Sequence, residues 1–442
     1  MLNDSAIHTP PTTGNFAYNS FNLTSPFMPV LGGTYVDPVF GETVRVSYRY
    51  DANGTPPVAG VADDIYAHHW ANSDGTLCFA TMNGVRAYNP VTGAVVYSNM
   101  PSGNMGTGSR ANLQWHPTDP DLYFYFDSSN AIRQYKPSTA TDSLVVTLAS
   151  LGIGTFDAAT TGGSHNWVDG TGDLFVIPAS AGGRVWKRST NTLYAGVTAN
   201  FSAGGGWLGI SPNGNSVLTA PGPAATPNTQ HYYYPINHVT HTVGSPIDFW
   251  GLMSDHFSWV NASDGHDYGL MFDAHGNGHL YVVDMTISRA GLTEAQQIAS
   301  AGVRLVMGQA GTTFDNIGTE GHMSGECIGA NRDWIFVSAE QPGDTFNSGI
   351  GGWKIYEQEI IAVNMVTLEC RRLAHHRSRS TQANYAYGPK PTTPWDGSRV
   401  IWQSNMNTSS PVGAVYNFSV AFSGGGAPDT TPPAAPTGLQ VT

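Results

Sequence analysis

One pattern recurs seven times in this chain of 442 residues, and it constrains the fold more than any other feature. Each copy has an anchor residue, a short polar turn, and an apolar or aromatic residue that begins a strand-like run. The anchors are Trp70, Trp115, Trp167, Ile210, Trp259, Cys327 and Thr393, the copy at Trp259 being looser than the others. Repeats of roughly 45 residues, each long enough for four short strands, are typical of β-propeller blades.

The runs after the turns are rich in β-branched and aromatic residues, as in 122–126 and 281–285, which indicates strands. One helical stretch is expected at 292–300, as an excursion between strands. The early segment Thr43–Tyr48 alternates apolar and polar residues. We expect it to add an outer strand to the last blade, because an open sheet edge invites aggregation. The fold class predicted is all-β, a seven-bladed β-propeller over residues 43–422 closed by an N-terminal strand, with residues 1–42 as an N-terminal arm.

The composition changes after Phe422. Residues 423–428 form a Gly-rich spacer, which is typical of a flexible linker. Residues 429–441 resemble the linker and first strand of a fibronectin type III module in secreted bacterial multidomain proteins. This resemblance implies a longer chain and a secreted or cell-surface location, with residues 423–442 as linker and module start. We expect the propeller to be monomeric within that longer chain.

Charge and hydropathy exclude several function classes. The formal net charge is −13 and only 12% of the residues are charged, so the chain lacks the basic footprint of a nucleic-acid-binding protein. It has no run of about 18 apolar residues, so we expect no membrane span. Three cysteines are too few for a disulfide framework and are expected to be buried thiols.

Polar residues just before the anchors are candidates for a functional funnel, because the innermost strand of each blade lines the propeller axis. Histidines occupy such places in four repeats: His68, His69, His165, His256 and His322. Repeat two offers Arg110 and Asn112, and repeat seven offers Gln382, Tyr385, Tyr387 and Lys390. A polar, histidine-lined funnel suits a sugar or an anionic ligand. For each histidine, a purely structural role in the hydrogen bonding of its blade is the alternative.

The pair His375-His376 precedes Arg377-Ser378-Arg379. This run is either a solvated basic loop or a positive rim for an acidic substrate.

Three stretches resemble the oligogalacturonate lyases, a family of seven-bladed propellers that cleave uronate glycans by β-elimination. They are Asp255–Val260, Gly321–Ser324, and Leu373–Tyr387 with its continuation at 395–404. The resemblance implies that His256 is the catalytic base and that His322 and Gln382 are metal ligands. At two further histidine ligands of the family this chain has Tyr385 and Tyr387, and the family's arginine in blade four is absent. No cofactor is firmly expected; manganese or calcium is the divalent metal that His322 and Gln382 could bind.

Two function hypotheses follow. The first is a polysaccharide lyase for an acidic polysaccharide or oligosaccharide, with His256 and Tyr387 as the catalytic pair and His69, Arg110, His165 and Lys390 binding the substrate. A tyrosine can share in proton transfer where cationic neighbours lower its pKa. The alternative is a non-catalytic propeller that binds a glycan or a protein within a larger secreted or cell-surface protein.

Overall fold

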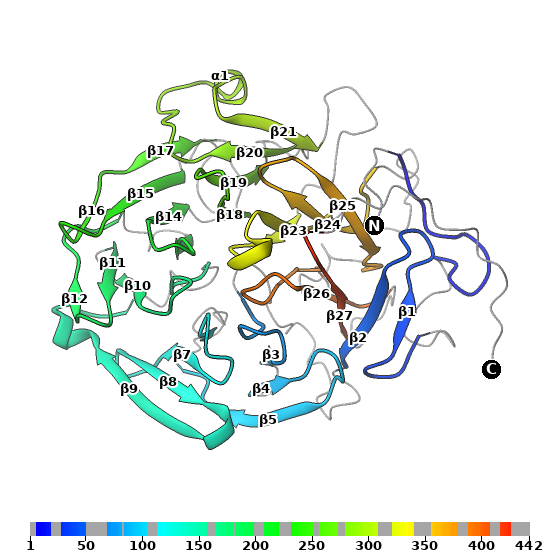
Figure 1. Cartoon of the computed structure of the whole chain (residues 1–442), viewed down its shortest axis with the longest axis horizontal. Coiled ribbons are helices and arrows are strands. Elements are labelled where there is room, and N and C mark those ends of the chain that lie inside the picture. The colour runs from blue at the N-terminus through cyan, green and yellow to red at the C-terminus, as the bar shows by residue number, and fades with distance from the viewer. Residues whose placement is uncertain are drawn as a thin grey trace.

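Seven small β-sheets surround one axis in the computed structural model, which confirms the predicted seven-bladed β-propeller (Figure 1). The structure describes residues 6–18, 28–49, 69–81, 84–103, 113–156, 165–179, 182–198, 207–220, 231–251, 256–272, 279–307, 321–339, 355–378, 388–406 and 416–425. Within these ranges no helix is long and apolar enough to cross a membrane. Cys78, Cys327 and Cys370 are buried free thiols, as expected.

Blades 1 to 3 follow one another along the chain as antiparallel sheets. Blade 1 consists of β3 (Cys78–Ala80), β4 (Val85–Tyr88) and β5 (Val95–Met100). Blade 2 consists of β6 (Leu113–Trp115), β7 (Tyr123–Phe126), β8 (Ala131–Lys136) and β9 (Thr141–Thr147), with η1 (Pro137–Thr139) and η2 (Leu148–Leu151) flanking β9. Blade 3 consists of β10 (Leu174–Ala179), β11 (Gly182–Lys187) and β12 (Thr192–Leu193).

Blades 4 to 6 repeat this arrangement. Blade 4 consists of β13 (Trp207–Ile210), β14 (Ser216–Ala220), β15 (His231–Asn237), β16 (Thr242–Val243) and β17 (Ile247–Trp250). Blade 5 consists of β18 (Phe257–Asn261), β19 (Asp267–Phe272), β20 (Leu280–Asp284) and β21 (Val303–Met307). Blade 6 consists of β22 (His322–Ser324), β23 (Trp334–Ser338), β24 (Glu359–Asn364) and β25 (Cys370–His375), with η5 (Gly329–Asn331) between its first two strands.

Blade 7 is built from both ends of the chain. β26 (Arg399–Ser404) pairs with β27 (Tyr416–Ala421), β27 pairs with β2 (Thr43–Arg49), and β1 (Thr34–Val36) lies outermost. The predicted closure of the ring by 43–48 is therefore confirmed. Because β2 occupies the edge of β27, the last blade is sealed by strand pairing rather than left open.

The one α-helix among the described residues, α1 (Glu294–Ile298), lies between β20 and β21, where the sequence indicated a helical excursion. Thr293 caps it: the Thr293 hydroxyl accepts from the Gln296 amide, and the Gln296 side chain accepts from the Thr293 amide. This capping box satisfies two amide groups that a helix N-terminus otherwise leaves unpaired.

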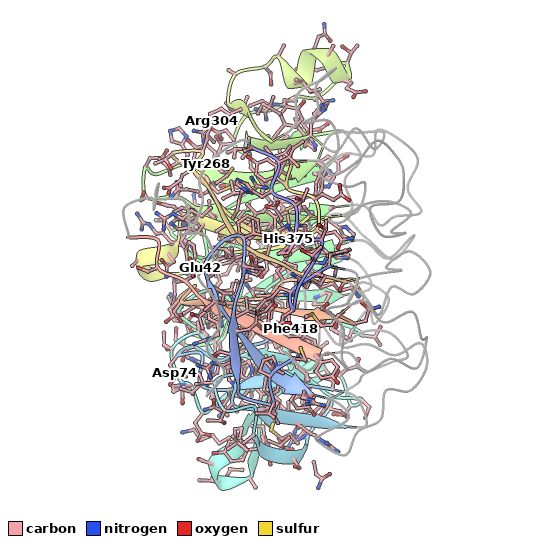
Figure 2. All side chains as sticks on the ribbon, turned by 90° about the vertical axis from the view of Figure 1, so that its right-hand side faces the viewer. Glu42, Asp74, Tyr268, Arg304, His375 and Phe418 are labelled. Carbon is pink, nitrogen blue, oxygen red and sulfur yellow. The ribbon has the colours of Figure 1, made fainter. Side chains whose placement is uncertain are left out.

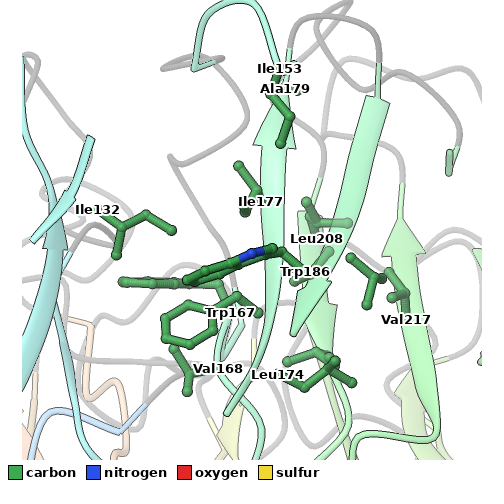
Figure 3. Packing of buried hydrophobic residues seen from close by; sticks show 14 of the residues in the cluster. Ile132, Ile153, Trp167, Val168, Leu174, Ile177, Ala179, Trp186, Leu208 and Val217 are labelled. Carbon is green, nitrogen blue, oxygen red and sulfur yellow. The ribbon is translucent and has the colours of Figure 1, made fainter. Parts of the chain in front are cut away.

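Neighbouring blades pack through their buried faces, and all seven anchors are at most 2% exposed. Between blades 2, 3 and 4, Trp167 and Trp186 lie in one buried cluster with Ile132, Leu208 and Val217 (Figure 3). Anchors also join blades by hydrogen bonds: the indole Nε1 of Trp115 donates to the carbonyl oxygen of Trp70 at 2.9 Å. The repeated anchors therefore specify the ring because each one fills the space between two blades.

The strand pairing of β2 can be tested by one substitution. Val46 is 0% exposed and packs in the cluster between blades 6 and 7, so Val46→Ala should lower the free energy of unfolding by about 2 kcal/mol. Val36 in the neighbouring β1 is 54% exposed, and Val36→Ala should change it by less than about 0.5 kcal/mol. Urea unfolding of both variants measures the difference, and equal effects would contradict the closure of the ring by β2.

Candidate functional site

A buried carboxylate lies at the centre of the ring. Glu326 directly precedes the anchor Cys327, is 0% exposed, and has a left-handed backbone with φ of 62°. Its Oε1 lies 2.5 Å from Nδ1 of His165 in blade 3, and its Oε2 accepts from the side-chain amide of Asn166 at 2.8 Å. Because a buried carboxylate is costly without partners, these bonds are what allow Glu326 to occupy the axis.

Side chains from blades 1 and 2 complete this network. Asn166 Oδ1 accepts from the backbone amide of His69 at 3.2 Å and from the Gln114 side chain, and Gln114 Oε1 accepts from the Trp167 amide at 2.7 Å. The ring nitrogens of His69 lie 2.7 Å and 3.1 Å from the carbonyl oxygens of Thr393 and Glu326. Burial lowers the pKa of His69, and the two carbonyl contacts oppose that shift.

Backbone bonds bring the two remaining blades into the same network. The Glu326 amide donates to Trp259 of blade 5 at 3.2 Å, and the Ile210 amide of blade 4 donates to Asn166 at 2.8 Å. We call His69, Gln114, His165, Asn166 and Glu326 the axial hub. All five residues are at most 1% exposed, so side chains fill the axis at this level.

A second group of polar residues lies at the starts of the inner strands of blades 5, 6 and 7. His256 precedes β18, His322 begins β22, and their ring centroids are 4.2 Å apart with an interplanar angle of 32°. Lys390 lies in the segment before β26. His256, His322 and Lys390 are 8%, 0% and 1% exposed, respectively, and we call them the axial triad.

The electrostatics of the axial triad follow from burial and from like charge. Burial is the largest cause that holds the pKa of His322 well below its ordinary value, followed by the charges of His256 and Lys390. His322 is therefore neutral at pH 7. A neutral imidazole in this place adds no positive charge beside His256.

The residues described around His322 do not by themselves form a divalent-metal site. Its described neighbours include a second imidazole, and the charge of Lys390 acts on His322. Manganese and calcium sites depend on carboxylate and carbonyl oxygens. In the described ranges no three histidine, cysteine or acidic side chains are grouped so that they could hold a metal ion. Gln382, the other predicted ligand, lies outside these ranges.

The structure separates the predicted histidines into two groups. His256 and His322 meet in the axial triad, whereas His69 and His165 belong to the axial hub, where their described contacts are structural. The ring of His165 also lies 4.3 Å from that of Phe257, next to His256. Arg110, Tyr385 and Tyr387 lie outside the described residues, as do His68 and Asn112.

The prediction of a basic rim or solvated loop at 375–378 is wrong. His375, His376, Arg377 and Ser378 are at most 1% exposed. The N-terminal arm covers this segment: His375 Nε2 lies 3.0 Å from the carbonyl oxygen of His8, and Arg377 donates to the carbonyl of Phe16 at 3.3 Å. Figure 2 labels His375 within the body of the molecule. Arg379 lies outside the described ranges.

Sequence reasoning missed Gln114, Asn166 and Glu326, which carry the axial hub. A signal was present, because each of them directly precedes an anchor residue. Of the predicted funnel residues, only His69 directly precedes its anchor.

The seven sheets define a β-propeller, and two solved structures with a similar fold are oligogalacturonate lyases. One, in complex with manganese, has a TM-score of 0.51 and 12% identity, and the similarity covers 96% of this chain and 98% of that one. Another, from Vibrio parahaemolyticus, has a TM-score of 0.51 and 11% identity over 95% and 98% of the two chains. At this identity the likeness establishes the fold alone. No protein-family model and no curated protein sequence matches the chain.

The axial hub predicts that loss of the Glu326 charge has a large effect on the free energy of unfolding. Glu326→Gln places an amide donor against the donors of His165 and Asn166, so the free energy of unfolding should fall by about 2–4 kcal/mol. Asp119→Asn removes a surface ion pair with Lys136, in which both side chains are more than a third exposed, and should cost less than about 1 kcal/mol. Chemical denaturation of both variants measures the two losses of stability. Equal losses would contradict the role of the hub.

The buried His376 predicts a specific dependence of stability on pH. Burial lowers the pKa of His376 to about 4, and the hydrogen bond from Nε2–H to the Ala339 carbonyl opposes that shift. The other ring nitrogen, Nδ1, accepts from the Ser378 amide at 3.0 Å. Between pH 6.5 and 4 the unfolded chain therefore binds a proton that the folded chain does not. Stability should be lost as the pH falls through this window, by up to about 1.4 kcal/mol per pH unit from this residue.

His376→Gln should reduce the slope of the free energy of unfolding against pH between pH 6.5 and 4. The reduction should correspond to about one bound proton. Urea unfolding at closely spaced pH values gives the slope for both proteins. An unchanged slope in the variant would show that His376 is protonated in the folded chain.

Proposed function

We propose that this chain is a secreted polysaccharide lyase that cleaves an acidic, uronate-containing glycan by β-elimination, with His256 as the base. The observation that carries the proposal is the axial triad: two imidazoles 4.2 Å apart, with the charge of Lys390 acting on one of them. The triad lies at the starts of inner strands from three adjacent blades. The fold shared with oligogalacturonate lyases supports the same reaction class.

The reaction needs a base beside the carbon that carries the uronate carboxylate. In the proposal, His256 removes the proton from this carbon, the electron pair forms a C=C bond, and the bond to the leaving sugar oxygen breaks. The leaving oxygen then takes up a proton. Because His322 stays neutral, the proton taken by His256 does not meet a second charged imidazole.

The carboxylate must also be held by a cation, since negative charge builds up beside it in the transition state. Lys390 is the residue proposed for this role, because its charge acts on His322 within the axial triad. Tyr387 is the proposed donor to the leaving oxygen, and Arg110 remains a proposed substrate contact.

The alternative function, a non-catalytic glycan-binding propeller, is favoured by one observation. All three residues of the axial triad are at most 8% exposed, so a long polysaccharide reaches them only if the chain around them rearranges. Binding of an acidic glycan without cleavage would be the outcome of this alternative.

The catalytic assignment is tested with a panel of acidic polysaccharides, measuring the absorbance of the unsaturated uronate product. His256→Ala should slow elimination by about 10²- to 10⁴-fold, because a general base is lost, while the glycan still binds. The matched control is His266→Ala in the same blade, whose side chain is 55% exposed in the turn after β18, and it should retain full activity.

Two results would contradict the proposal in different ways. Full activity of His256→Ala would exclude His256 as the base and make Tyr387 the next candidate. Tight binding of an acidic glycan without unsaturated product from the unmodified protein would favour the binding module.

A further inference from the structure

A groove of about 600 Å³ lies on the outer perimeter of the ring, between blades 2 and 3. It borders β8 and β9 of blade 2 and β11 of blade 3, two blades that are neighbours in the ring in Figure 1. β9 has seven residues whereas β12, the outermost strand of blade 3, has two. This mismatch leaves space beside β9, and the volume lies in the range of small-ligand sites.

Arg188 is fixed at one side of this groove. One of its terminal nitrogens donates to the side-chain oxygen of Gln134 at 2.9 Å, and its guanidinium lies 5.4 Å from the centre of the Phe124 ring. Within the described ranges no carboxylate lies within ion-pair distance of Arg188. The Asp173 carboxylate, for example, accepts instead from the amide and hydroxyl of Ser189. Arg188 is therefore a partly exposed cation whose position is fixed by these contacts. It has no carboxylate partner in the described ranges.

Two amide side chains of the groove, Gln134 and Asn191, present donors. The Gln134 oxygen is occupied by Arg188, and the Asn191 oxygen accepts from the Trp186 indole at 3.1 Å. Each amide thus keeps its NH₂ group for a ligand. The floor is apolar, with Leu144 55% exposed and Val145 partly buried beside it. A ligand that fits must combine a negatively charged acceptor with an apolar face.

We propose that this groove binds a carboxylate-bearing sugar unit of an acidic glycan, with Arg188 on the carboxylate and the apolar face of the sugar ring on Leu144. A pyranuronate carries both features on one rigid ring, whereas an acidic peptide must also order a flexible side chain. Arg188 suits this role because its planar fork binds carboxylates through two parallel hydrogen bonds. The proposal uses the acidic glycan of the proposed function but not its cleavage, so it holds whether or not His256 is a base.

Calorimetric titration with trigalacturonate tests the groove in the full chain. Arg188→Gln should weaken one class of binding site by about 10- to 100-fold, as expected for the loss of charge-assisted hydrogen bonds. Arg133→Gln is the matched control, because Arg133 lies on the same strand as Gln134 but pairs with Asp142 at 3.0 Å. It should leave binding unchanged.

A second variant tests the groove independently, in case Arg188→Gln fails to fold. Asn191→Asp keeps an oxygen for the Trp186 indole but replaces the NH₂ donor with a negative charge, so it should also abolish this class of site. Maltotriose, which lacks carboxylates, should not bind there.

The outcomes separate this proposal from the catalytic one. If binding is unaffected by both Arg188→Gln and Asn191→Asp, the groove assignment is wrong, whatever the activity of the protein. If triglutamate rather than trigalacturonate binds in an Arg188-dependent way, the ligand is an acidic peptide and the sugar assignment is overturned. Loss of elimination in His256→Ala with the Arg188-dependent site intact would leave the groove assignment standing.

Discussion

The fold depends on the burial of one carboxylate, that of Glu326, on the axis of the ring. The inner strand of every blade turns an edge toward the axis, and its backbone amides need partners there. Glu326, Asn166 and Gln114 supply oxygen acceptors to three such amides, those of Asn166, His69 and Trp167. The blades are therefore joined at the centre by polar contacts as well as by the apolar anchors between them. Because the axial hub fills the axis, any ligand that enters there must stop above it.

The sequence predicted the architecture well because its signals are local and repeated. The anchors, the polar turns after them and the alternation of Thr43–Tyr48 are each readable within a few residues. The axial hub was not predicted, because Glu326 finds His165 and Asn166 across 161 and 160 residues of chain. The place of Glu326 directly before an anchor indicates a position near the axis, but nothing in the local run of 325–327 shows which distant side chains will pair with its carboxylate.

The candidate site was only partly predictable for the same reason. Histidines near similar positions in the repeats meet different neighbours once the ring closes. His165 faces a carboxylate, whereas His322 faces His256 and the charge of Lys390. The sequence predicts a charged surface at 375–378. In the structure the N-terminal arm, which is more than 360 residues away along the chain, covers this run and supplies carbonyl acceptors to it. Exposure of a charged run depends on such distant partners, which sequence patterning does not reveal.

The central claim is that the axial triad receives a uronate carboxylate next to a base. A crystal structure of the protein with bound trigalacturonate tests it most directly. The account predicts a sugar carboxylate within hydrogen-bond distance of Lys390 Nζ, and a ring nitrogen of His256 about 3 Å from the carbon beside that carboxylate. A glycan seated only elsewhere on the ring, with His256, His322 and Lys390 unchanged and without contact to it, would contradict the account.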